Sequence, residues 1–433
     1  MKRILLIIIF LAPMLSFSQK QGKDVDQVKY SRSSLHVMMI EDPSMMKKDI
    51  IINTFTEMDF PNKYNNHLLK ERYANIIGEL SEMTKAGIPG FKLKGIEDKI
   101  ANYFKEKRTA NQLVAKWVNR DPESGLMNMD TIQYRGLWNA DASDLEVGNM
   151  LNKATDYLKN SGTDLIKNTF VVMEYFEFID NEKIAKPLAI ATYEATKIEI
   201  NKGDMPDMAK KIALKAAEKL LEKALEKAQG YSVITHAYLY QLDWNDTIMI
   251  NFVKSCWMPE NNTYSEEKRQ QRIQAFNNPD LFNLKFVGKA GATVVITNFK
   301  TERSESDQIK EATIRSVDKV YIKLQKQFDV FKTKTQFYHF AKNGKVCTAK
   351  IGKKEGLNGD EKFDVLEQKF TTNGSTKWVK KGTIKVDKKA VWDNRYYITK
   401  PPELTNEDAI VATSFKGCKK GWDELILLLR QQK

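Results

Sequence analysis

The sequence is poor in the residues that build disulfide frameworks and metal sites. Cys256, Cys347 and Cys418 are its only cysteines, and no two of them form a Cys-x-x-Cys pair, which excludes a disulfide-rich scaffold. The four histidines have no other histidine or cysteine at the spacing of common zinc sites, so we expect neither a metal nor a cofactor. One hypothesis pairs Cys347 with Cys418 in an oxidising compartment and leaves Cys256 free; the alternative is three free thiols.

Long apolar runs are absent except at the start of the chain. Lys2 and Arg3 precede an apolar run from Ile4 to Leu15, which Ser16-Phe17-Ser18 follows. This pattern predicts a cleaved secretory signal peptide over residues 1–18. A retained anchor helix is the alternative, but the run is shorter than the ~20 residues that span a bilayer. We expect an exported protein that is periplasmic, associated with the outer membrane, or extracellular.

Catalytic motifs are also missing. There is no Gly-x-Ser-x-Gly motif, and the stretch Gly288 to Thr293 lacks the order of a phosphate-binding loop, so we expect a hairpin turn there. Glu174 and Glu177 lie an odd number of residues apart on a predicted strand and must point to opposite faces. The sequence therefore predicts a protein that is not an enzyme. The alternative is a secreted hydrolase whose acids converge from distant segments.

Positive charge is abundant and uneven. Lys and Arg number 69 against 56 Asp and Glu, a formal net charge of +13, and residues 341–400 alone hold 15 Lys and Arg against 7 Asp and Glu. Such a segment favours an acidic protein, glycan or lipid head group as partner. Export makes nucleic acid an unsuitable partner. A lysine-rich surface that only keeps the chain in solution is the alternative, and a homo-oligomer stays open.

Aromatic residues beside lysines mark the candidate partner-binding surface. It comprises Lys377, Trp378, Lys380, Lys381 and Arg395. Exposed tryptophans there could stack on a sugar, which makes a glycan-binding module a further alternative. The opposing interpretation places the tryptophans in the core of a small barrel and the lysines on its outer face.

The first third of the chain mixes extended and helical patterns. Extended segments are expected at Leu35 to Ile40 and Asp49 to Phe55. Apolar residues from Ile96 to Trp117 recur with a helical period, which predicts an amphipathic helix running into a short strand. Ser143, with Glu146 three residues later, has the spacing of a capping box at the start of another helix.

The middle of the chain predicts a sheet with helices packed on it. Strands are expected at Thr169 to Asp180, Tyr231 to Trp244 and Thr247 to Trp257, because these runs are dense in β-branched and aromatic residues. A helix from Asp204 to Gln229 separates the first two strands. Residues 284–299 predict a strand or hairpin, and a helix follows over residues 304–328. The fold class is therefore α+β, with helices on a mostly antiparallel or mixed sheet, over residues 19–330.

From Phe331 onward the apolar period changes to two. Short runs up to Ile398, separated by Gly, Asn, Asp and Lys turns, predict a small basic β-barrel-like module over residues 331–400. Residues 401–433 are expected to form a polar connector and a final apolar element, Trp422 to Leu429, that docks back.

Two segments resemble bacterial envelope assembly proteins. The run from Asn111 to Asp180, with its VNRD and NTFVVMEYFEF segments, and the run GYSVITHAYLYQLDWND ending at Asp246 are similar to the α/β domain of curli-secretion-type proteins. The turn pattern AKIGKKEGLNGDEKFDVLE, Ala349 to Glu367, resembles the C-terminal β-module of flagellar assembly protein T.

This resemblance implies a non-catalytic envelope protein that binds other proteins as a scaffold or assembly component. It supplies no ligand or catalytic residue. No segment reads as a membrane-spanning hairpin, so pore formation is not part of the expectation. No cysteine follows the predicted signal peptide to carry a lipid anchor.

Overall fold

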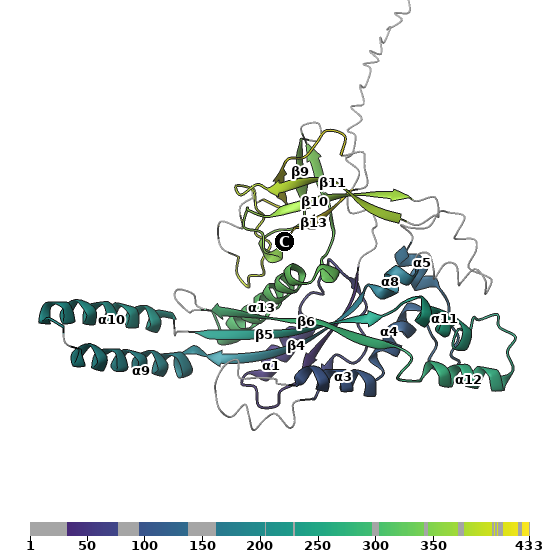
Figure 1. Cartoon of the computed structure of the whole chain (residues 1–433), viewed down its shortest axis with the longest axis horizontal. Helices are drawn as coiled ribbons and strands as arrows, with labels where there is room; N and C mark the ends of the chain where they lie inside the picture. The colour runs from purple at the N-terminus through teal and green to yellow at the C-terminus, as the bar shows by residue number, and fades with distance from the viewer. Residues whose placement is uncertain are drawn as a thin grey trace, which may run out of the picture.

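The computed structural model describes residues 33–432, apart from 77–94, 137–161, 204, 228–229, 297–302, 342–344, 371–375, 401, 403–404, 406–409 and 423–426. The predicted signal peptide and the helix behind Ser143 lie outside these residues. Two sheets organise the chain, one built before residue 300 and one after residue 334 (Figure 1). Within the described ranges, no helix combines the length and the apolar character needed to cross a bilayer.

The first sheet is mixed, as predicted. Its strand order is β2-β1-β4-β5-β6, with β3 also pairing with β1. Strand β1 is parallel to β4, whereas β4, β5 and β6 pair antiparallel. The bounds are β1 Ser34–Ile40, β2 Asn65–Asn66, β3 Tyr73–Ala74, β4 Thr169–Asp180, β5 Tyr231–Asp243 and β6 Asn283–Ile296.

Helices cover both faces of this sheet (Figure 1). On one face, α1 (Lys48–Glu57) and α13 (Glu305–Gln327) pack on Phe170, Val172 and Phe176. On the other face, α3 (Ile96–Glu106) and α4 (Thr109–Trp117) pack on the alternate β4 residues Val171, Met173 and Tyr175. A third core gathers Trp117, Trp244 and Phe252, and its helices are α5 (Asp130–Gly136), α8 (Thr163–Lys167), α11 (Asp246–Ser255) and α12 (Glu266–Phe276).

Two predicted strands are helices. The segment Asp49 to Phe55 belongs to α1, because Ile51, Thr54 and Phe55 bury one helical face in spite of their β-branched neighbours. The segment Thr247 to Trp257 forms most of α11, where the Asn245 side chain caps the helix by accepting from the Ile248 amide at 3.1 Å. The β-propensity of the residues favoured a strand in both places, but the packing of one helical face against the core stabilises a helix instead.

Three further details differ from prediction. The helix over residues 96–117 is broken into α3 and α4 at Arg108, which has a φ of 53°, and no strand follows Trp117 in the described residues. Strand β6 is one continuous strand, so the expected hairpin turn at Gly288 to Thr293 is wrong. Glycine is needed at position 288 because a Cβ there would lie 2.1 Å from the Phe328 ring.

A helical hairpin extends from the end of β4 to the start of β5. Helix α10 (Asp207–Lys227) confirms the helix predicted at Asp204 to Gln229. Helix α9 (Asn181–Lys202) was not predicted and contains Pro187. The two helices pack on each other and project beyond the sheet (Figure 1).

The second sheet forms the predicted β-module. Its seven strands pair antiparallel in the order β7-β13-β10-β11-β12-β9-β8. The bounds are β7 Thr335–Gln336, β8 His339–Ala341, β9 Val346–Ala349, β10 Lys362–Phe370, β11 Thr376–Val386, β12 Thr413–Lys416 and β13 Leu427–Gln431. The Cys347–Cys418 disulfide is present, and Cys256 is free and buried.

The end of the chain is an integral part of this sheet. Strands β12 and β13 both come from the region expected to be a connector and a docking element, and β13 lies between β7 and β10. Leu429 on β13 pairs with Val365 and joins the module's core. By contrast, no strand forms at Arg395 to Ile398. The prediction of a connector was wrong, because the short apolar runs near the end of the chain pair with strands from residues 335–386 and complete their sheet.

Candidate functional site

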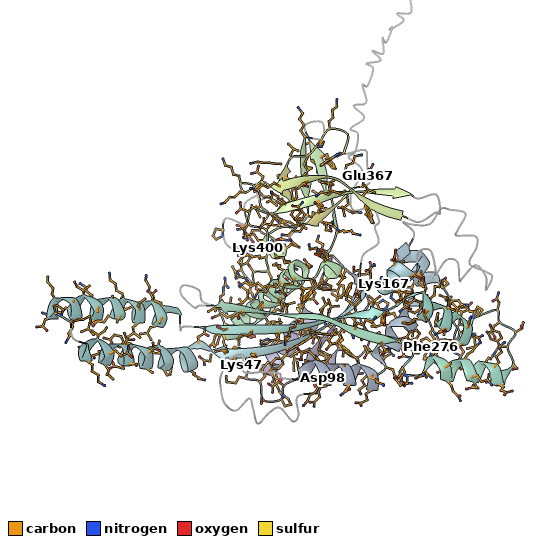
Figure 2. All side chains as sticks on the ribbon, viewed as in Figure 1. Lys47, Asp98, Lys167, Phe276, Glu367 and Lys400 are labelled. Atoms are coloured by element: carbon orange, nitrogen blue, oxygen red, sulfur yellow. A yellow bond between two sulfur atoms is a disulfide. The ribbon has the colours of Figure 1, made fainter. Side chains whose placement is uncertain are left out.

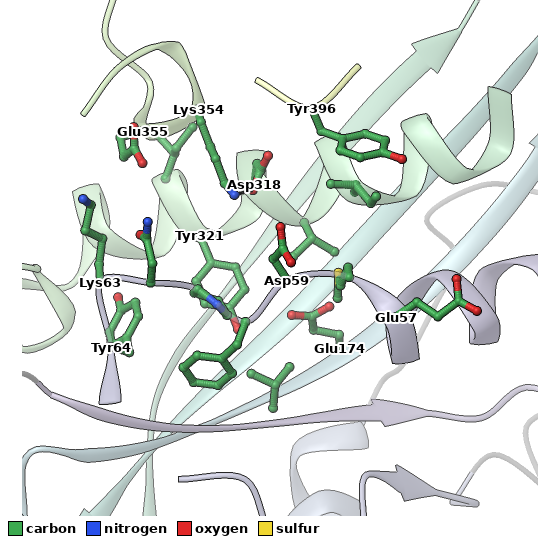
Figure 3. A pocket seen from close by; sticks show the side chains of 18 of the residues that line it. Glu57, Asp59, Lys63, Tyr64, Glu174, Asp318, Tyr321, Lys354, Glu355 and Tyr396 are labelled. Atoms are coloured by element: carbon green, nitrogen blue, oxygen red, sulfur yellow. Dashed lines mark ion pairs between the residues drawn. The ribbon is translucent and has the colours of Figure 1, made fainter. Parts of the chain in front are cut away.

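A cleft of about 250 Å³ lies where the α/β domain meets the β-module (Figure 3). The segment from Glu57, the last residue of α1, to Tyr64 forms one wall and α13 forms another. The β-module contributes Lys354 and Glu355, from the short 3-10 helix η4 (Lys353–Glu355), and Tyr396. Neither domain builds the cleft alone.

Helix α13 and strand β4 place the polar groups at the base of the cleft. Ser304 caps α13 by accepting from the Asp307 amide at 3.1 Å, which fixes where the helix begins. Asp318, Tyr321 and Gln325 then recur every three or four residues and share a helical face. Glu174 lies on the face of β4 that points at α13, between the core residues Val172 and Phe176 of the same face.

Glu174 is a completely buried carboxyl group without a hydrogen-bond partner. Neither of its side-chain oxygens makes a hydrogen bond among the described residues. Burial raises its pKa to about 8, an effect that Tyr321 and Arg72 oppose and Asp318 reinforces. At neutral pH Glu174 is therefore mostly protonated and can donate as well as accept a hydrogen bond.

Asp318 is the second buried acid of the cleft. Burial raises its pKa to about 6, while Lys354 lowers it through a 3.7 Å contact between Nζ and Oδ1. Its other oxygen, Oδ2, is buried and has no partner among the described residues. Asp318 is thus mostly ionised at neutral pH, so one cleft holds a neutral acid and a charged one.

Two tyrosines of the cleft differ in whether their hydroxyl groups are hydrogen-bonded. The Tyr64 hydroxyl donates to the Phe331 carbonyl at 3.2 Å and accepts from Gln325 Nε2 at 3.1 Å. The hydroxyl of Tyr321 is buried beside the Glu174 carboxyl group and makes no well-formed hydrogen bond among the described residues. Buried polar groups are nearly always paired, so a cluster of unpaired ones marks a place that a ligand or water completes.

The charges around the cleft are balanced. Lys310 pairs with Glu57 at 3.6 Å, and the Glu355 carboxylate accepts from the Gly352 amide at 2.6 Å and from Asn394 at 2.9 Å. Besides Glu174, four acids and four bases line the cleft: Glu57, Asp59, Asp318 and Glu355, and Lys63, Arg72, Lys310 and Lys354. This lining favours a neutral or zwitterionic ligand over a strongly charged one.

The predicted lysine surface does not form one cationic patch. On β11, Lys380 pairs with Asp364 at 2.7 Å and Lys381 pairs with Glu367 at 3.3 Å. Trp378 is half-buried against Leu366. The backbone of Lys377 lies in β11, and its side chain is outside the described residues. These lysines are largely neutralised by acids of the same sheet.

Arg395 lies apart from β11. Its guanidinium makes two hydrogen bonds to Asp393, at 2.9 and 2.6 Å, and stacks on Tyr397, which also contacts Arg315 of α13. The Asp393 carboxylate raises the pKa of Arg395 further. The structure therefore brings Trp378, Lys380 and Lys381 together on β11 and places Arg395 beside the α/β domain.

The other residues considered from the sequence have structural partners. Glu174 and Glu177 point to opposite faces, as predicted: Glu177 Oε1 lies 2.9 Å from His236 Nε2 on the α3 face. Trp392 is half-buried. Among the described residues no cluster of three or more His, Cys, Asp or Glu side chains could hold a metal ion.

Asp318 and Tyr321 were missed as site residues. The apolar period predicts the helix over residues 304–328 but does not say which of its polar positions face a cleft. A signal existed, since Asp318 directly follows the buried Val317 and lies four residues after Ile314, at the edge of the core-facing stripe.

Comparison with known proteins gives no relative: no family model matches this chain, and no curated protein matches it.

Proposed function

We propose that this protein is an exported, non-catalytic component of the cell envelope that acts by binding a partner, and that the cleft between its two domains receives a short segment of that partner. Its place would be the periplasm or the outer membrane, in a scaffold or assembly role. The observation that carries the proposal is the convergence of Glu174, Asp318 and Tyr321 in one cleft with unpaired buried polar atoms.

The chemistry of the cleft supports a polypeptide segment as ligand. A peptide presents carbonyl acceptors and N–H donors side by side. Protonated Glu174 and the Tyr321 hydroxyl can donate to carbonyls, and Asp318 Oδ2 can accept from an N–H. The walls add apolar side chains that suit a partner's side chains: Val37, Met58, Phe60, Pro61, Leu68, Ile314, Val317 and Ile322.

The sequence supports the cellular setting. The signal-peptide pattern over residues 1–18 favours export, and the resemblance to curli-secretion-type and flagellar assembly proteins favours protein binding over catalysis. The site is composed of two domains, so a bound segment would contact both and hold them together.

Site-specific photo-cross-linking in the producing cell tests this proposal. A photoreactive amino acid replaces Tyr396, which lines the cleft, and in a matched strain it replaces Tyr264, a partly exposed tyrosine of the α/β domain outside the cleft. We expect position 396 to give a consistent set of adducts with envelope proteins and position 264 to give none of them. The same adducts from both positions, or none from position 396, would reject the cleft as the binding site.

A hydrolase is the second candidate, and one observation favours it. Glu174 and Asp318 come from distant segments, line one cleft, and have pKa values of about 8 and 6. Between these values Glu174 can act as a general acid and Asp318 as a general base.

This candidate predicts hydrolysis of a glycoside, ester or peptide probe with a bell-shaped pH profile between about pH 6 and pH 8. Glu174→Gln and Asp318→Asn should each abolish it. Failure of all three classes of probe across this pH range would leave the binding function alone.

A further inference from the structure

The α9–α10 hairpin carries an apolar surface that no described part of the chain covers. It projects past the sheet, and its side chains extend into space that no other described element occupies (Figures 1 and 2). Its helices pack on each other and contact little else besides the end of β4. An exposed apolar surface of this kind is typical of an interaction site.

The exposed residues form a stripe along α10. Met208, Ile212 and Leu220 are 78%, 67% and 68% exposed, and they follow one another at multiples of four residues. The opposite side of α10 is fixed by α9: Ala217 is buried, and the Tyr193 hydroxyl of α9 donates to Glu218 at 3.5 Å. Met208 and Ile212 therefore point away from the hairpin's own contact, and Leu220, three residues after Ala217, lies at its exposed edge.

A row of lysines runs beside the stripe. Lys211, Lys215, Lys219 and Lys223 recur every four residues and are all exposed. Within the described ranges none of them makes an ion pair. The helix holds six lysines and four acids: Asp207 in its first turn, Glu218 beside Tyr193, and Glu222 and Glu226 at the end nearest the sheet. The distal part of α10 is therefore apolar with a net positive charge.

We infer that this stripe and lysine row, together called the hairpin face, bind an anionic lipid surface. An amphipathic helix with lysines beside its apolar stripe lies in the membrane interface, where the apolar side chains enter the acyl boundary and the lysines meet anionic head groups. A second copy of this chain fits less well, because it would bring its own lysine row toward this one. The projection of the hairpin beyond the sheet leaves the face accessible to a flat surface.

A local fluorescent probe tests this inference. Met208→Cys, labelled with an environment-sensitive dye, reports on the hairpin alone, because Cys256 is buried and the other two cysteines are bonded. The full chain is titrated with vesicles of phosphatidylglycerol mixed with phosphatidylcholine, and with vesicles of phosphatidylcholine alone. A matched label at Lys389→Cys, exposed on the β-module, is the control.

We expect the dye at position 208 to shift to the blue and brighten only with the anionic vesicles, and the dye at position 389 to stay unchanged. In protein without the dye, the triple variant Lys211→Glu, Lys215→Glu, Lys219→Glu should partition onto the anionic vesicles more than about tenfold less than the wild type does. The triple reversal Lys385→Glu, Lys388→Glu, Lys389→Glu on the β-module should not. A blue shift that grows with protein concentration without lipid would show self-association, and no shift with any vesicle would equally overturn the inference.

Discussion

The cleft at Glu174 and the lysine surface of β11 are both candidate binding sites, and they differ in how their polar groups are satisfied. On β11, Lys380 and Lys381 are each paired with an acid of the same sheet. In the cleft, Glu174 has no partner among the described residues although it is completely buried. A charge that is already paired has little to offer a ligand, whereas an unpaired buried group costs free energy that a ligand can recover. The comparison favours the cleft as the site.

The largest expected effect is on the pH dependence of stability. Because the pKa of Glu174 is raised from 4.5 to about 8, the unfolded chain releases this proton at lower pH than the folded chain does. Its contribution to stability is therefore fully present below about pH 4.5 and is lost as the pH rises toward 8, by about 4 kcal/mol between pH 5 and pH 8. In Glu174→Gln this loss should disappear.

Urea unfolding of wild type and Glu174→Gln at several pH values measures the difference. The two free energies of unfolding should be similar at pH 5 and should separate at pH 8, with the variant the more stable. Parallel curves would mean that Glu174 is ionised in the folded protein, and the account of the cleft as an unsatisfied site would fail.

A second buried glutamate sharpens the comparison, because replacing it by glutamine should lower the free energy of unfolding, whereas Glu174→Gln should raise it. Glu311 of α13 is buried too, but it accepts hydrogen bonds from Arg303 at 2.7 Å and from Arg315 at 3.1 Å. Glu311→Gln removes the charge that these two arginines share and should cost about 2 kcal/mol at pH 7. Glu57→Gln, at a mostly exposed pair with Lys310, is the control and should change the free energy of unfolding by less than about 1 kcal/mol.

The smallest expected effect concerns the lysine surface. Lys380→Glu, Lys381→Glu breaks two partly exposed ion pairs and should lower the free energy of unfolding by about 1 kcal/mol or less. If that surface binds the partner, less partner should be recovered from cells with the double variant than with the wild type. The cleft account predicts unchanged recovery, measured by quantitative mass spectrometry of a tagged protein after cross-linking.

Much of the fold could be predicted from the sequence, and the exceptions have physical reasons. Strands β4 and β5 and helix α13 follow from local pattern, because their apolar residues repeat with the period of the element. Helix α11 could not be separated from a strand, since a short run such as TIMINFV fits both periods until packing chooses. Strand β13 lies between β7 and β10, both of which come much earlier in the sequence, so no local pattern shows where it pairs.

The candidate site was less accessible to sequence reasoning than the fold. Glu174 could be placed on one face of a strand, but the partner of that face is a helix more than a hundred residues later. Asp318 and Tyr321 carry no motif, and their significance lies in what they lack, which is a hydrogen-bond partner. Only the three-dimensional arrangement shows that absence. The lysine surface was conspicuous in the sequence because its neutralising acids, Asp364 and Glu367, lie on the preceding strand β10 and meet these lysines only when β10 and β11 pair.

The most direct test of the central claim compares the two sites in the same cells. A photoreactive amino acid is placed at Tyr396 in the cleft or at Trp378 on β11, and the adducts are identified by mass spectrometry. We predict that position 396 captures a reproducible set of envelope proteins, that Glu174→Gln combined with Asp318→Asn reduces this capture, and that position 378 does not capture the same set. Capture from position 378 alone, unaffected by the changes in the cleft, would contradict the account.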